Sequence, residues 1–139
     1  MSLYNIFDIA GSGMSAQTTR LNLVASNLAN ADTVSSSTTK TYRSRQPVFA
    51  TVLHDAMGSN KAVSKGVRVL GIVESQAPLR KEYAPQHPMA NDDGYIYKPN
   101  VNVIEEMANM MSASRTYQNN VEMLNTAKQL LQQTLKIGQ

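Results

Sequence analysis

Two long segments, one near each end of the chain, carry apolar side chains at alternating steps of four and three residues. In residues 3–31 only Gln17 interrupts the series, and in residues 103–135 only Ser114 and Lys128 do. This spacing gathers the apolar side chains on one narrow stripe of an α-helix. The pattern therefore predicts a long helix at each end of the chain.

The two stripes are expected to pack on each other. A stripe of two apolar residues per heptad is too narrow to bury a long helix inside a chain of 139 residues. We therefore predict a two-helix coiled coil, antiparallel or parallel. The residues expected to form its contacts are Leu21, Val24 and Leu28 of the first helix, pressing on Val121, Leu124 and Leu131 of the second.

The chain between the helices has a different composition. Residues 33–41 form a Ser/Thr tract, residues 63–73 alternate apolar with polar side chains, and residues 77–99 contain four prolines and an Asp-Gly turn signal. We predict a small region containing a β-hairpin. The fold class is then mainly α, with helices in residues 1–32 and 101–139 and a loop and small β region in residues 33–100.

The outward faces of the predicted helices carry amides and hydroxyls where a solvated helix usually carries Lys and Glu. Examples are Ser12, Asn27, Asn119 and Gln132. Uncharged polar groups lose less than charges on leaving water, provided that they find hydrogen-bond partners. These faces are therefore expected to contact further subunits.

The residue content points away from an enzyme, a metal site or a bound cofactor. There is no cysteine, the two histidines are isolated, and Asp92-Asp93 precede a glycine as turn residues do. A net charge of +3 comes from basic residues scattered between residues 33 and 100, without a nucleic-acid-binding motif. We expect no catalytic residue, no metal or cofactor and no nucleic-acid partner.

No apolar run reaches the roughly 20 residues that span a bilayer, so the chain is expected not to cross a membrane. Its first residues lack the basic start and continuous apolar stretch of a cleaved signal peptide. If the chain is exported, it is expected to use a route that reads another signal.

Several stretches resemble the family of flagellar rod, hook and hook-associated proteins. Residues 27–33, NLANADT, are similar to the family's N-terminal signature N-(L/I)-A-N-x-x-T, and residues 42–43 to the Tyr-basic pair that follows it. Residues 100–118, with Asn120, resemble the C-terminal signatures V-N-x-x-x-E-M and A-x-R-x-Y. Residues 3–12 and the short length resemble the proximal-rod members. A longer Ser/Thr tract stands where many members have a short Gly-Tyr turn.

The resemblance implies a structural subunit of the basal-body rod that polymerises helically through its terminal helices. Such a rod is a torque-transmitting drive shaft in the periplasm, with a channel for export. The implied partners are further copies, neighbouring proximal- and distal-rod proteins, the adaptor at the export gate and the flagellar type III export apparatus, which exports these proteins without a cleaved signal.

The resemblance also singles out residues expected to fix joints between helices or subunits. They are Asn27, Asn30, Thr33, Glu106, Met107, Arg115, Tyr117 and Asn120. The asparagines are equally compatible with helix caps or hydrogen-bonded core groups. The alternative to a rod subunit is a coiled-coil adaptor or export chaperone that binds one partner and never polymerises, and cooperative helical melting of an isolated monomer would favour it.

Overall fold

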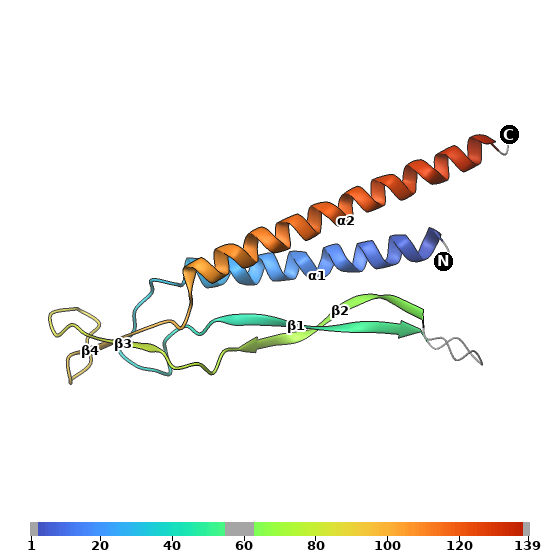
Figure 1. Cartoon of the computed structure of the whole chain (residues 1–139). Coiled ribbons are helices and arrows are strands. Elements are labelled where there is room, and N and C mark those ends of the chain that lie inside the picture. The colour runs from blue at the N-terminus through green and yellow to red at the C-terminus, as the bar shows by residue number, and fades with distance from the viewer. Residues whose placement is uncertain (1–2, 55–62, 138–139) are drawn as a thin grey trace.

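The computed structural model describes residues 3–54 and 63–137 and contains two long helices with two β-hairpins between them (Figure 1). The mainly α fold with a small β region is therefore confirmed. In chain order the elements are α1 (Leu3–Ala29), β1 (Arg45–His54), β2 (Val63–Glu74), β3 (Arg80–Tyr83), β4 (Tyr95–Lys98) and α2 (Val103–Ile137).

The two helices run antiparallel, with the start of α2 lying on the end of α1. The guanidinium of Arg20 donates to Asn109 Oδ1 at 2.8 Å. Nearer the termini, a Cβ placed on Gly13 would lie 2.9 Å from Asn120 Nδ2. Figure 1 shows the helices diverging beyond this point, toward the two chain ends. Supercoiling of the pair stays a prediction.

The predicted contact between residues 21–28 and residues 121–131 is wrong. Because Arg20 pairs with Asn109, the second group begins at least 12 residues further along α2, about 18 Å away at 1.5 Å per residue. The reason is that the central region brings the chain back to the end of α1 at which it left. The first half of α2 then packs on the second half of α1.

The residues buried between the helices are smaller and more polar than the predicted stripe. On α2 the buried side chains include Glu106, Ala113 and Ala127, each one position before a member of the predicted series. Met107 of that series is 53% exposed and Leu135 is 71% exposed. Small side chains let the two backbones approach closely, so this close approach rather than a row of leucines sets the helix contact.

The hairpin of β1 and β2 packs on the side of α1 opposite α2 (Figure 1). The strands are antiparallel, with Arg45 opposite Glu74. Ser12 Oγ accepts a hydrogen bond from the Val67 N–H at 3.1 Å. The neighbouring Gly66 has a φ of 131°, and a Cβ there would lie 2.2 Å from Ser12 Oγ, so only glycine fits. The expectation that Ser12 faces other subunits is corrected, since it binds the hairpin of its own chain.

The second hairpin, β3 with β4, lies beyond the end of α1 at the far end of the molecule (Figure 1). Ser35, from the Ser/Thr tract, exchanges backbone hydrogen bonds with Tyr97 of β4 at 3.0 and 2.9 Å. Pro99, after β4, is among the most deeply buried side chains. The connection into α2 is thereby fixed in place.

The close helix approach at Gly13 gives the first testable prediction. Gly11→Ala is expected to raise the free energy of unfolding by about 0.5–1 kcal/mol, because alanine is the better helix former and nothing lies within 4 Å of the new Cβ. Gly13→Ala is expected to gain less or to destabilise, since Asn120 must move aside. Urea unfolding followed by circular dichroism measures both variants, and equal gains would contradict the close approach.

Candidate assembly site

A cluster of hydrogen bonds centred on Asn27 joins the end of α1 to the start of β1. Asn27 is 1% exposed. Its Oδ1 accepts from the Arg45 N–H at 2.9 Å and from the Tyr42 hydroxyl at 2.8 Å. Its Nδ2 donates to the Arg45 carbonyl at 2.9 Å and to Ser44 Oγ at 3.4 Å. The amide thus satisfies both backbone groups of one β1 residue, as a neighbouring strand would.

Asn100 joins the residue before β1 to the residues that follow β2. Its Oδ1 accepts from the Ser44 N–H at 2.9 Å, and its Nδ2 donates to the carbonyls of Ser75 and Ala77 at 3.3 and 3.0 Å. Arg43 donates to the same two carbonyls at 3.2 and 3.5 Å. We call the residues Asn27, Ser44 and Asn100 the polar junction, because they hold α1, both strands of the first hairpin and the approach to α2 together.

Glu106 lies against the polar junction from α2 and is only 5% exposed. Its Oε2 has no hydrogen-bond partner among the residues that the structure describes. Burial raises the pKa of Glu106 above its ordinary value, and Glu105 adds to this, while Asn27, Ser44 and Arg20 counteract part of it. A carboxylate with an unpaired oxygen therefore sits inside the contact between the helices.

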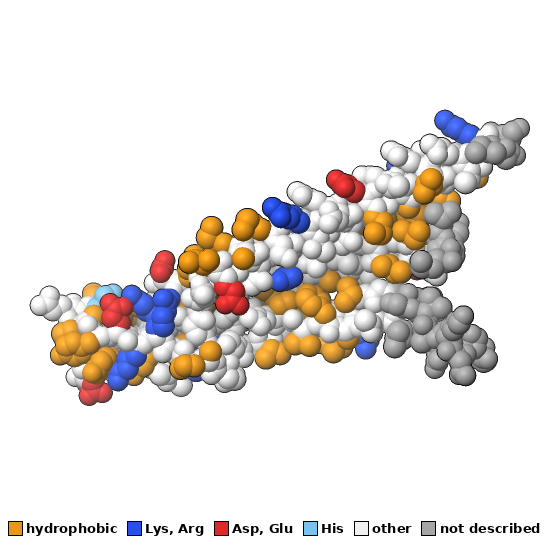
Figure 2. All heavy atoms as spheres, viewed as in Figure 1, with side chains coloured by type: hydrophobic (Ala, Val, Ile, Leu, Met, Phe, Trp, Pro, Cys, Tyr) orange, Lys and Arg blue, Asp and Glu red, His pale blue; other side chains and the backbone are white. Residues whose placement is uncertain are grey.

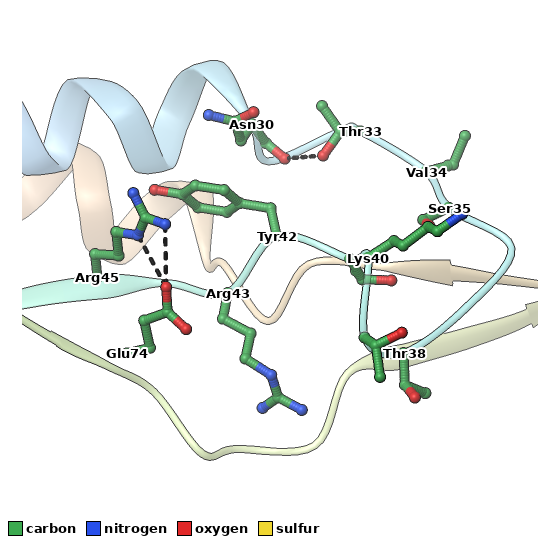
Figure 3. A pocket seen from close by; sticks show the side chains of 12 residues that line it. Asn30, Thr33, Val34, Ser35, Thr38, Lys40, Tyr42, Arg43, Arg45 and Glu74 are labelled. Atoms are coloured by element: carbon green, nitrogen blue, oxygen red, sulfur yellow. Dashed lines mark hydrogen bonds and ion pairs between the residues drawn. The ribbon is translucent and has the colours of Figure 1, made fainter.

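A polar cavity of about 710 Å³ lies outside the polar junction, beneath the Ser/Thr tract (Figure 3). Arg45 crosses its wall, paired with Glu74 at 3.0 Å and stacked 5.5 Å from the centre of the Tyr42 ring. Lys40 and Arg43 also line it. The longer loop thus folds back over the start of the hairpin, with Thr41 buried.

The predicted joint residues fall into three groups. Asn27 and Glu106 are buried and meet at the polar junction. Asn30 and Thr33 end α1, where the Asn30 amide donates to the Ser26 carbonyl and the Thr33 hydroxyl to the Asn30 carbonyl. The remaining signature residues lie along α2, with Asn120 half-buried beside Gly13 and with Met107, Arg115 and Tyr117 exposed.

Of the residues chosen from the apolar stripes, only Val24 is fully buried. The others keep part of their surface exposed and are Leu21, Leu28, Val121, Leu124 and Leu131. The contact predicted between these two groups within one chain is the one corrected above, and a role for these residues in assembly stays a prediction.

Sequence reasoning missed the exposed apolar surface of the single chain. On α2, Ile104 is 80% exposed and Met111 is 58% exposed, and on β2, Leu70 and Ile72 are 59% and 54% exposed. The signal available in the sequence was the pair Ile104 and Met107, which lie three residues apart and so share one face of the helix. Sequence reasoning also missed Ser44 as a partner of Asn27, and Asn100 as a partner of Ser44.

Within residues 3–54 and 63–137 there is no group of side chains arranged to hold a metal ion. Over the same part of the chain, no helix is both long and apolar enough to cross a membrane.

Comparison with known proteins gives two family matches and a set of full-length relatives. The model described as "Flagella basal body rod protein" matches residues 7–34, and that described as "Flagellar basal body rod FlgEFG protein C-terminal" matches residues 92–137. The chain is 51% identical to the flagellar basal-body rod protein FlgC of Escherichia coli O6:H1 and 50% identical to that of Salmonella typhimurium, each over 100% of both chains. It is 31% identical to that of Borreliella burgdorferi, over 100% of this chain and 99% of the relative.

Removing the amide of Asn27 is expected to destabilise the fold. Asn27→Ala leaves the N–H and carbonyl of Arg45 unpaired, and we expect a loss of about 2–4 kcal/mol in the free energy of unfolding. Asn22→Ala is the matched control, because Asn22 is exposed on the same helix, and it is expected to change stability by less than about 0.5 kcal/mol. Similar losses in the two variants would contradict the central role of Asn27.

Replacing Glu106 is expected to change how stability depends on pH. A raised pKa in the folded state means that Glu106 contributes its stability fully below about pH 4.5 and loses it as pH rises through the raised pKa. Glu106→Gln keeps the shape but cannot ionise. Its unfolding free energy, relative to wild type, is therefore expected to improve between about pH 4 and pH 7. Urea unfolding across that range checks this, and a pH-independent difference would argue against it.

Proposed function

The chain belongs to the flagellar basal-body rod protein family and is a structural subunit of the rod, and on this premise we propose that it polymerises helically through its terminal helices. The polymer forms the proximal part of a torque-transmitting shaft in the periplasm and surrounds a channel through which later subunits are exported. Other rod proteins and the adaptor at the export gate flank it, and the flagellar type III apparatus exports it without a cleaved signal peptide.

The main support for polymerisation through the helices is the apolar surface exposed along α2. Val103, Ile104, Met107 and Met111 all lie exposed near its start, and Met123, Leu130 and Leu135 lie exposed toward its end. Figure 2 shows hydrophobic side chains gathered at both ends of this helix. Apolar surface of this extent is uncommon on a protein that acts alone and is typical of a protein–protein contact.

The alternative, a small adaptor or chaperone that binds one partner, has less support. An adaptor needs one apolar face for its partner, whereas here apolar residues are exposed along most of α2 and also on β2. Surfaces on several sides suit a subunit with several neighbours, as helical packing requires.

The proposal is tested with a strain that lacks the gene and carries either the wild-type gene or one of two variants. Ile104→Asp is expected to abolish motility and leave basal bodies with missing or truncated rods. Ile104 is 80% exposed in the second position of α2, where an acidic residue favours the helix, so the variant chain is expected to keep its fold. Electron microscopy of basal bodies and swarming on soft agar are the measurements.

Gln86→Asp is the matched control, because Gln86 is exposed on the connection between β3 and β4, away from the helices. It adds the same charge and is expected to leave rods complete. Complete rods in the strain without the gene would refute the rod assignment. Complete rods with Ile104→Asp would instead refute the contact through α2.

A further inference from the structure

A second cavity, of about 400 Å³, is lined by residues of α1, of β1 and of the start of α2. Its apolar wall is formed by Val24, Pro47 and Phe49, and its polar wall includes Glu105 and Glu106. Figure 2 shows hydrophobic side chains between the helices and the first hairpin, with acidic and basic groups beside them. The cavity therefore has an apolar side and a polar side, on which the acids Glu105 and Glu106 lie together with Arg20 and Arg45.

The carboxyl of Glu106 is the unexplained group in this cavity. Glu106 is only 5% exposed, and its Oε2 meets no hydrogen-bond donor in the described part of the chain. The two cations that also line the cavity are engaged elsewhere, since Arg20 donates to Asn109 and Arg45 pairs with Glu74. Asn27 and Ser44 offset only part of the burial of this carboxyl, and Oε2 lacks a donor or cation among the described residues, so the isolated chain leaves this site incomplete.

We propose that a lysine or arginine side chain from an adjoining rod subunit enters this cavity and pairs with Glu106. The aliphatic part of such a side chain packs on Val24, Pro47 and Phe49, while its charged end reaches the acidic wall. Glu105, which is exposed, adds negative charge to the same cavity. The inference rests on the proposed function, because the partner is a neighbour in the rod.

The chemistry of the walls favours a long cationic side chain over a free metal ion. A hard cation such as Ca²⁺ or Mg²⁺ takes six or more oxygen ligands, whereas much of this cavity is lined by carbon. Burial raises the pKa of Glu106, and an incoming cation would lower it again, so the carboxylate gains most from a partner that carries positive charge.

The first test uses the opposite effects that Glu106→Gln should have on the subunit and on the rod. The isolated variant is expected to be at least as stable as wild type near neutral pH. The number of basal bodies with complete rods is expected to fall about tenfold or more, because a charge-assisted hydrogen bond between subunits is lost. Glu122→Gln, at an exposed glutamate of the same helix outside this cavity, is the control and is expected to leave rods complete.

The second test identifies the partner. A photocrosslinking amino acid replaces Gln46, which is exposed and lines the cavity, and adducts from intact basal bodies are mapped by mass spectrometry. An adduct on a rod-subunit peptide next to a Lys or Arg supports the proposal, and charge reversal of that residue is expected to reproduce the Glu106→Gln defect.

Rods as complete with Glu106→Gln as with wild type would overturn the inference and indicate that water satisfies the carboxylate. So would adducts confined to peptides without Lys or Arg. In both cases the wild-type gene still restores rods, and the proposed function stands. Complete rods in the strain that lacks the gene would instead refute the proposed function itself.

Discussion

The pairing of the Asn27 amide with the backbone of Arg45 is the contact on which the arrangement of the chain depends. A side-chain amide has one acceptor and one donor group in one plane, and it therefore imitates the edge of a strand. By bonding both the N–H and the carbonyl of Arg45, it fixes where β1 begins relative to the last turns of α1. A leucine at this position would bury more carbon, but would leave β1 without a defined start.

The direction of α2 also follows from contacts at the start of β1. Asn100 bonds Ser44, the residue before β1, so the chain three residues before α2 is held at the start of β1. The N-cap at Asn102 then begins the helix, with its Oδ1 accepting from the Ile104 N–H at 3.2 Å. Because the helix starts beside Asn27, it has to run back along α1 toward the N-terminus. Two asparagines thus set the antiparallel order of elements separated by more than 70 residues in sequence.

The sequence carried enough information for the helices, but not for their alignment. Periodicity predicted both helices, and the second, expected within residues 101–139, spans Val103–Ile137. The same periodicity favoured Met107 over Glu106 as the buried residue, because a stripe is chosen by apolar content. A carboxylate is buried there because Asn27 and Ser44 approach it from elements that are far away in sequence. Likewise, nothing near Ser12 indicates that Val67 is its partner, since that contact depends on where the hairpin docks.

The face that α2 turns toward α1 also explains why a single chain is an incomplete unit. Turning Glu106 and Ala113 inward turns Met107 and Met111 outward, so the polar junction is built at the cost of exposing apolar side chains on α2. Neither feature suits a solitary protein, because one leaves a carboxylate oxygen without a hydrogen-bond donor among the described residues and the other leaves apolar side chains in water. Both suit a subunit whose neighbours cover the apolar face and supply a cation to the acid. The orientation of α2 about its own axis thereby links the internal fold of the subunit to its assembly.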